Sequence, residues 1–413
     1  MKQEFRIGRR TACVEIPEAN FIGRIEANPT SFGLIGEAAV KAALDKPIGA
    51  PDLRMVVHPG EKIAIVTSDI TRPCPSSKIL PIVLDRLYEA GIRKEDITLV
   101  FALGSHRKQT PEEMRHLAGE RAWKEIHCVD SDPDDCVRLG FTDAGTPVDI
   151  TRSVAEADRR ICLANIEFHY FAGYSGGAKS IMPGVSTRAA IQCNHRMMVR
   201  QEAHAGKLDG NPIREDIEQA GAILGIDYIV NVVLDEKKEI VKAVAGDAVA
   251  AHRAGCAFLD TMYRRKIPQR ADIVLVSQGG APKDLNLYQT QKALDNAKHA
   301  VKDGGIIILI GSCHEGLGEH TFEEWIHWAK TPQDLIDRVK TDFKLGGHKA
   351  AAIALVLERA DVYLVSEMSD ELAKECFLTP FSDAQSALNA AFEKLGRQAT
   401  VLAIPYGGSV LPF

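Results

Sequence analysis

The hydrophobic pattern of the first half alternates between strand-like runs and a helix-like repeat. Residues 62–67 and 97–103 are short apolar runs, and between them apolar side chains recur at helical spacing over residues 76–90. A further apolar run covers residues 160–166. A strand, a helix and a strand in close succession predict a right-handed βαβ unit in a parallel sheet.

The end of this half has its own signals. Asn211 followed by Pro212 predicts the start of a helix, because asparagine caps helices and proline is favoured at the first helical position. The apolar runs at 228–234 and 239–245 flank a charged turn and predict a hairpin.

The second half repeats the α/β pattern. Strands are expected at residues 272–277 and 306–310, with a helix over 286–303 between them. Further strands are expected at residues 362–365 and 400–404, and further helices at 350–359 and 383–395. The polar, proline-containing segment 264–270 is the candidate linker. The fold class is therefore α/β, with two doubly wound domains, a cofactor-binding one at 1–267 and a C-terminal one at 268–413.

Composition narrows the classes of function. The formal net charge of −6 and a pI near 6.1 provide no basic surplus for a nucleic acid. The N-terminal residues lack the apolar core of a signal peptide, and no apolar run approaches the length of a membrane helix. The nine cysteines include no C-x-x-C pair, which favours reduced thiols. We expect a cytoplasmic protein without nucleic-acid or membrane partners.

Unusual polar residues follow three of the predicted strands. Asp69 and Arg72 follow the first, His106 follows the second and His169 follows the third. Ligands in open parallel sheets bind beyond the carboxyl ends of the strands. A single histidine is more often structural, but two at equivalent strand ends beside a carboxylate and a guanidinium favour a site.

The most specialised segment is FAGYSGGAKS, residues 171–180. Its glycines, Gly173, Gly176 and Gly177, permit positive φ and close approach of the backbone to a phosphate, although a tight turn alone would also explain them. The segment also satisfies G-x-S-x-G, which would make Ser175 an acyl-transfer nucleophile. It is not a P-loop, because Ala178 replaces the second glycine.

In the second domain, Gln289 and Lys292 stand three residues apart on a predicted helix and so share one face. A lysine and an amide presented together suit a carboxylate. A solvated polar stripe on an amphipathic helix is the alternative reading of this pair.

Taken together, these segments resemble the nickel-pincer lactate racemase superfamily, and the resemblance covers both halves of the chain. The matching segments are DITRP (69–73), GSHR (104–107), HYFAGYSGGAKSIMPG (169–184), NH (194–195) and YQTQK (288–292). The resemblance implies a racemase or epimerase of a small, lactate-like 2-hydroxy acid.

The resemblance also implies a cofactor. In that family it is a nickel-pincer nucleotide, pyridinium-3,5-bisthiocarboxylic acid mononucleotide nickel, covalently linked to a lysine that Lys179 matches. His195, sixteen residues later, matches the one protein ligand of the nickel. Three pincer donors and one imidazole suit the tetragonal preference of nickel. Separate enzymes would synthesise the cofactor, so these are the expected protein partners.

The implied roles of the remaining residues follow the reaction. His106 and His169 would be the paired acid and base, while hydride moves reversibly between the α-carbon of the substrate and the cofactor. Arg72, Gln289 and Lys292 would hold the carboxylate, which places the active site in the cleft between the domains. Asp69 is a candidate either to orient a histidine or to contact the nucleotide.

Three alternatives remain at this level. The first is a serine hydrolase that uses Ser175, and the second is a non-catalytic protein that binds an organic anion. A nicotinamide-dependent dehydrogenase is disfavoured, because no G-x-G-x-x-G opens either βαβ unit.

Overall fold

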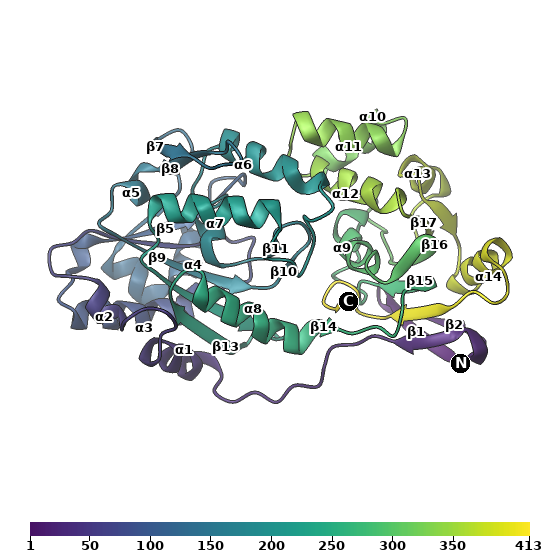
Figure 1. Cartoon of the computed structure of the whole chain (residues 1–413), viewed down its shortest axis with the longest axis horizontal. Coiled ribbons are helices and arrows are strands. Elements are labelled where there is room, and N and C mark those ends of the chain that lie inside the picture. The colour runs from purple at the N-terminus through teal and green to yellow at the C-terminus, as the bar shows by residue number, and fades with distance from the viewer. The chain divides into compact units, whose positions relative to one another are not determined.

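The computed structural model describes residues 1–413, which form two compact units (Figure 1). Unit 2 comprises residues Thr30–Asp260. Unit 1 comprises Met1–Pro29 together with Thr261–Phe413. Both units combine helices with a mostly parallel sheet, so the predicted α/β class with two domains is confirmed. No helix has the length and apolar character needed to cross a membrane.

Unit 2 is built on a six-stranded sheet of order β13-β12-β9-β4-β5-β6. Its strands are β4 (Ile63–Ser68), β5 (Ile97–Ala102), β6 (His127–Asp130), β9 (Arg159–Ile166), β12 (Tyr228–Leu234) and β13 (Ile240–Gly246). Only β13 is antiparallel, because it returns from β12 in a hairpin. Two small antiparallel pairs join β7 (Cys136–Phe141) to β8 (Pro147–Thr151) and β10 (Phe168–His169) to β11 (Gly173–Tyr174).

Eight α-helices accompany this sheet. They are α1 (Gly36–Asp45), α2 (Leu53–Val56), α3 (Ser76–Glu89), α4 (Pro111–Glu125), α5 (Arg152–Ala155), α6 (Arg188–His195), α7 (Pro212–Leu224) and α8 (Ala250–Tyr263), the last of which ends in unit 1. Asn211 caps α7, since its side chain accepts hydrogen bonds from Ile213 and Arg214. The helix start predicted there, the βαβ unit β4-α3-β5 and the β12–β13 hairpin are all confirmed.

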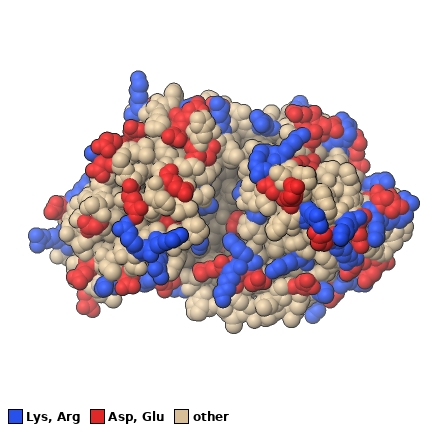
Figure 2. Space-filling model, turned by 180° about the vertical axis from the view of Figure 1, so that it is seen from behind, with Lys and Arg blue, Asp and Glu red and all other residues tan.

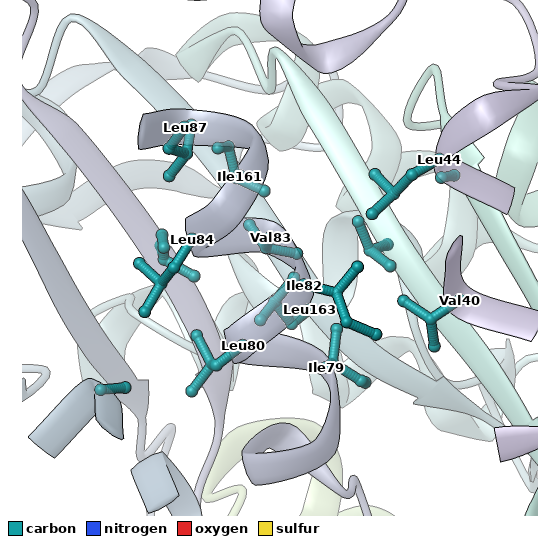
Figure 3. Packing of buried hydrophobic residues seen from close by; sticks show 14 of the residues in the cluster. Val40, Leu44, Ile79, Leu80, Ile82, Val83, Leu84, Leu87, Ile161 and Leu163 are labelled. Atoms are coloured by element: carbon teal, nitrogen blue, oxygen red, sulfur yellow. The ribbon is translucent and has the colours of Figure 1, made fainter. Parts of the chain in front are cut away.

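The main core of unit 2 lies between α3 and the sheet. Leu80, Val83 and Leu87 are fully buried and pack with Ile161 and Leu163 of β9 (Figure 3). Their spacing of three and four residues places them on one face of the helix. This packing holds β4, β5 and β9 in register and so fixes where their carboxyl ends lie.

Unit 1 has a six-stranded, fully parallel sheet of order β18-β17-β16-β15-β19-β3. The strands are β3 (Phe21–Arg24), β15 (Ala271–Ser277), β16 (Val301–Ile310), β17 (Ala360–Val365), β18 (Thr379–Phe381) and β19 (Val401–Ile404). The helices are α9 (Leu287–Ala297), α10 (His320–Trp328), α11 (Pro332–Thr341), α12 (Gly347–Leu357), α13 (Asp370–Glu375) and α14 (Ala384–Leu395). Small strand pairs are β1 (Lys2–Ile7) with β2 (Arg10–Glu15), and β14 (Arg264–Arg265) with β20 (Leu411–Pro412).

The unit boundaries differ from the expected division at residue 267. The first 29 residues belong with the C-terminal unit, because β3 extends its sheet beside β19 and the β1–β2 hairpin adds Phe5 and Val14 to its core. The expected linker 264–270 is partly folded, since β14 pairs with β20. The chain therefore passes between the units twice, near residues 29 and 260.

The predicted helix over 286–303 is too long. Helix α9 ends at Ala297, and Val301 already pairs with Ala271 at the start of β16. The strand runs through Gly304 and Gly305 to Ile310, with an irregular register opposite Ala271 and Ile273. On the face seen in Figure 2, acidic and basic side chains are interspersed.

Candidate active site

The polar segments after three strands of unit 2 lie at one edge of its sheet. Strand β4 lies between β9 and β5 and runs parallel to both. The turn after β4 carries Asp69 and Arg72, the turn after β5 carries His106, and His169 follows β9 in β10. The structure thus brings the four positions to the same edge, as the strand order requires.

His106 is paired with Asp69. The imidazole Nδ1 lies 2.7 Å from Asp69 Oδ2, and the carboxylate is 2% exposed. Thr71 donates a hydrogen bond of 2.8 Å to the other oxygen, Oδ1. An ionised carboxylate only accepts hydrogen bonds, so Nδ1 of His106 carries the proton and Nε2 has a lone pair. This arrangement suits a general base.

His169 has a different partner. Its Nδ1 accepts a hydrogen bond of 3.3 Å from the backbone amide of Ala172, which places the proton of the neutral ring on Nε2. Burial lowers the pKa of His169 well below its usual value, and the nearby charges of Lys179 and Arg72 lower it further. The two histidines therefore present opposite hydrogen-bonding character at Nε2.

Phe171 joins three of the candidate residues. Its ring centroid lies 4.5 Å from that of His169 and 4.9 Å from that of His195, in edge-to-face contacts. The Nζ atom of Lys179 lies 5.7 Å from the same ring centroid. Phe171 is 3% exposed, so one buried aromatic ring fixes the spacing of the two imidazoles and the amine.

Lys179 stands in a short 3₁₀ helix, η3 (Gly177–Ser180), after the glycine-rich loop. Burial lowers the pKa of its amine well below the usual value, and the positive charges of Arg214 and Arg72 act in the same direction. A lysine that loses its proton readily is a nucleophile, and this is the property that covalent attachment to an acyl-type group requires.

The glycine-rich loop packs tightly against the backbone of Lys207 and the side chains of His252 and Asn231. A Cβ at Gly173 would lie 2.0 Å from the carbonyl oxygen of Lys207, and one at Gly177 would lie 2.9 Å from His252. Both residues have positive φ, at +76° and +59°. The Gly177 amide donates to Asn231 Oδ1 at 2.7 Å. The tight geometry thus accounts for the glycines, and the Gly177 amide is already engaged.

The side chain of Arg214 in α7 hydrogen-bonds to the backbone of the same loop. Its guanidinium is fully buried and donates hydrogen bonds to the carbonyl oxygens of Ala172, Tyr174 and Gly176. Burial lowers the pKa of Arg214 to about 10. His252 Nε2 donates to the Ser175 carbonyl at 2.8 Å. These contacts fix the backbone that leads to Lys179.

The Ser175 hydroxyl is bound to backbone. It donates to the Asn165 carbonyl at 2.8 Å and accepts a hydrogen bond of 2.9 Å from the Glu167 amide. The nearby imidazole of His252 contacts the carbonyl of Ser175 and not its hydroxyl. This arrangement anchors the loop and differs from the serine–histidine contact of an acyl-transfer nucleophile.

His195 ends α6 and is 7% exposed. Its Nδ1 lies 2.8 Å from Asn194 Oδ1. No three His, Cys, Asp or Glu side chains gather in a group that could hold a metal ion. A metal bound to His195 would therefore take most of its donors from groups other than these four side-chain types.

Gln289 and Lys292 lie in unit 1, on α9, and form one cluster as their spacing predicts. Lys292 Nζ donates to Gln289 Oε1 at 2.9 Å. The two units are separate compact bodies, so the expectation that this pair completes the substrate site stays a prediction.

The sequence did not indicate four supporting residues of unit 2. They are Asn231, His252, Arg214 and Asp216, and all are buried. Asn231 lies in the middle of the predicted strand 228–234, and Arg214 and Asp216 lie in the first turns of the helix predicted to begin at Pro212. A polar residue on a buried face of such an element was the available signal.

Comparison with models of known protein families shows which family the chain is similar to. A model of the lactate racemase N-terminal domain matches residues 7–206, and one of the lactate racemase C-terminal domain matches residues 267–411. The chain belongs to the lactate racemase family. Its resemblance to that family in the sequence is thereby confirmed.

Two relatives in the lactate racemase family match nearly the whole chain. A lactate racemase from Thermoanaerobacterium thermosaccharolyticum is 32% identical over 420 residues, which are 99% of this chain and 98% of that protein. One from Lactiplantibacillus plantarum is 31% identical over 416 residues, 98% of this chain and 97% of that protein.

Solved structures agree with the fold. The lactate racemase apoprotein from T. thermosaccharolyticum superposes with a TM-score of 0.89 at 31% identity, and the match covers 100% of each chain. A protein from Thermotoga maritima shares the fold at a TM-score of 0.63 and 20% identity, over 92% of this chain and all of that one.

Proposed function

We propose that this chain is an isomerase that racemises or epimerises a small 2-hydroxy acid, with lactate as the first candidate. Family membership and two lactate racemases that match over nearly the full chain support the reaction class. The observation that carries the proposal is the grouping of His169, His195 and Lys179 around Phe171.

We further propose that the protein works with a nickel-pincer nucleotide. The residues present fit this group. Lys179 has an amine with a lowered pKa, suited to covalent attachment, and His195 offers one imidazole where no cluster of protein ligands exists. When bound, the cofactor would accept the α-hydrogen of the substrate with its bonding electrons and return it.

His106 would act as the base. Its Nε2 lone pair, fixed by the Nδ1 contact with Asp69, would take the proton of the substrate hydroxyl. Asp69 would therefore orient a histidine, which is one of the two roles open to it from the sequence. His169 would donate a hydrogen bond from Nε2 to the same oxygen. To act as the base for the opposite enantiomer, its ring would first have to carry the proton on Nδ1 and give up the hydrogen bond from the Ala172 amide.

The substrate carboxylate would be held by arginine and lysine. Arg72 is exposed at the edge where His106 and His169 lie, and its planar fork matches a carboxylate. We propose that Gln289 and Lys292 add a second set of donors from unit 1.

The two alternative functions make different predictions. A serine hydrolase needs a free Ser175 hydroxyl beside an imidazole, whereas this hydroxyl is bound to the backbone of β9 and of Glu167. A non-catalytic anion-binding protein would retain Arg72 but would leave the Asp69–His106 pair without a purpose.

The test is an enantiomer assay. The chain is co-produced with the cofactor-synthesis enzymes, incubated with one enantiomer of lactate or of other 2-hydroxy acids, and sampled by chiral chromatography. We expect the opposite enantiomer to appear, and His106→Asn and His169→Asn each to slow this at least about 100-fold. Ester hydrolysis abolished by Ser175→Ala, without racemisation of any acid, would support the hydrolase instead.

A further inference from the structure

A buried polar network extends behind His195. Asn194 is fully buried and Asp216 of α7 is 3% exposed. Asn194 Nδ2 donates to Asp216 Oδ2 at 2.7 Å and to the Ile213 carbonyl at 3.2 Å, and Asn194 Oδ1 lies 2.8 Å from His195 Nδ1. A continuous series of hydrogen bonds therefore connects Asp216 of α7 through Asn194, near the end of α6, to the imidazole of His195.

The far end of the network is closed by two threonines. Thr146 donates to Asp216 Oδ2 at 2.8 Å, and Thr142 donates to Asp216 Oδ1. Both threonines belong to the turn that joins β7 to β8. The Asp216 carboxylate thus receives three hydrogen bonds, all from uncharged groups, in a place where an unbound carboxylate would be costly.

This network determines which way the Asn194 amide faces. A carboxylate only accepts hydrogen bonds, so the group of Asn194 that faces Asp216 must be its NH₂. The Ile213 carbonyl, also an acceptor, imposes the same orientation. The amide oxygen then faces His195, and an amide oxygen only accepts, so Nδ1 of His195 must carry the proton.

We propose that Asp216, acting through Asn194, is a positioning residue that holds His195 in the tautomer with its lone pair on Nε2. This inference rests on the proposed function, in which His195 is the protein ligand of nickel. A neutral imidazole ligates a metal through its unprotonated nitrogen, and the group bonded to the other nitrogen fixes the tautomer and the ring orientation.

Exchanging the side chains of positions 194 and 216 keeps the net charge and tests whether the orientation of the amide, rather than the packing of the site, sets the His195 tautomer. In Asp216→Asn one of the two acceptors that hold the Asn194 NH₂ is replaced by an amide that can present its own NH₂, while the Ile213 carbonyl still favours the original orientation. A fraction of the molecules can then have Asn194 turned over with a donor toward His195, which favours the wrong tautomer. Asn194→Asp places two carboxylates side by side. The double variant Asn194→Asp/Asp216→Asn restores an acceptor toward His195 Nδ1 and a donor–acceptor pair between positions 194 and 216, at the same net charge. It does not restore the hydrogen bond to the Ile213 carbonyl.

The first readout needs no cofactor. Long-range ¹H–¹⁵N spectra of the apoprotein, labelled on its 13 histidines and recorded where imidazole is neutral, report the tautomer of each ring; His195→Gln identifies the relevant signal. We expect the Nδ1–H tautomer in the wild type, a measurable part of the population in the other tautomer in Asp216→Asn, and the return of the Nδ1–H tautomer in the double variant. A wild-type ring protonated on Nε2, or an unchanged tautomer in Asp216→Asn, would overturn the inference.

The second readout uses the holoprotein. We expect nickel to leave Asp216→Asn about 10- to 100-fold faster than the wild type in the presence of a chelator, with the mass adduct on Lys179 unchanged and with recovery in the double variant. Glu218→Gln, an acid-to-amide change on the same helix outside the network, should behave as the wild type. Equal rates in wild type and Asp216→Asn would overturn the inference.

Failure of the proposed function would be seen in the nickel content and the mass adduct of the wild type and of His195→Ala. Wild-type protein without adduct or nickel, or His195→Ala that retains nickel as the wild type does, would remove the nickel role from His195 and overturn the inference as a statement about metal binding. The tautomer spectra would still show whether Asp216 orients the ring.

Discussion

Asp69 lies behind His106, whereas a backbone amide faces His169. Asp69 Oδ2 lies 2.7 Å from Nδ1 of His106 and so keeps the ring proton on that nitrogen. The Ala172 amide donates to Nδ1 of His169, so the proton of that ring is on Nε2. Two side chains of one type thus differ in hydrogen-bonding character because their neighbours differ. A protein that accepts both hands of one substrate needs such a pair rather than one histidine.

The role of Asp69 is testable by an isosteric change. In Asp69→Asn the amide can donate to His106 Nδ1, which would move the proton of the ring to Nε2 and remove the base. We expect kcat for racemisation to fall about 10²- to 10⁴-fold with KM little changed.

A matched control is Asp158→Asn, since Asp158 accepts from the Lys62 amide at the opposite end of β4. Steady-state kinetics in both directions measure the effect. Equal activity of Asp69→Asn and Asp158→Asn would contradict the assignment.

At the scale of elements, α7, β12 and α8 together support the backbone that leads to Lys179. The backbone of residues 174–177, from the end of β11 to the start of η3, is bound by Arg214 from α7, Asn231 from β12 and His252 from α8. The backbone can approach these groups because glycine stands at the contact points. The rigid loop then presents one lysine at a defined place.

A pair of glycine substitutions tests this support. Gly173 and Gly145 have nearly the same φ, +76° and +79°, but a Cβ at Gly173 would lie 2.0 Å from the Lys207 carbonyl while Gly145 has open space. The strain of positive φ, about 1 kcal/mol, is common to both alanine variants. We therefore expect Gly173→Ala to reduce cofactor attachment and the unfolding temperature clearly more than Gly145→Ala.

Intact mass and thermal unfolding of both variants measure these effects. Similar behaviour of the two would show that close packing at Gly173 is unimportant.

The sequence predicted those elements that have local signals. The β4-α3-β5 unit has apolar runs and a helical repeat, and the Asn211-Pro212 cap is a local signal too. The end of α9 was mispredicted, because Val301 joins β16 only through its pairing with Ala271. The Asp69–His106 contact likewise depends on the order of strands, which spacing along the chain does not reveal.

For the whole molecule, the path of the chain was the least predictable feature. Residues 1–29 join a sheet whose other strands come after residue 270, and this pairing is decided by contacts hundreds of residues apart. By contrast, two α/β units followed directly from the number and spacing of strand-like runs.

The division into units predicts a separation of functions. All of the residues proposed to bind the cofactor lie in unit 2, and Gln289 and Lys292 lie in unit 1. We expect Lys292→Ala to raise KM for the 2-hydroxy acid about tenfold or more, since a charged contact to the substrate is lost, while nickel content and the Lys179 adduct stay unchanged. Kinetics, metal analysis and intact mass test this. A variant without nickel would contradict the separation.

Stability should depend on pH through His252. Burial lowers its pKa from 6.5 to about 3, so between these values the unfolded chain binds a proton that the folded chain does not. The free energy of unfolding therefore falls as pH falls below 6.5, by up to about 1.4 kcal/mol per pH unit from this group.

His252→Gln retains a donor for the Ser175 carbonyl but does not titrate. Denaturant unfolding between about pH 7 and pH 5 should give a shallower dependence for this variant by one proton. Equal slopes would contradict the assignment of this effect to His252.

The most direct test of the account is the intact mass and nickel content of protein co-produced with the cofactor-synthesis enzymes, comparing wild type with Lys179→Ala. We predict a covalent adduct with about one nickel per wild-type chain, in keeping with one matched lysine and one matched histidine, and no adduct in Lys179→Ala. Wild-type protein with neither adduct nor nickel, yet fully able to racemise a 2-hydroxy acid, would contradict the proposed cofactor and the site built around Lys179.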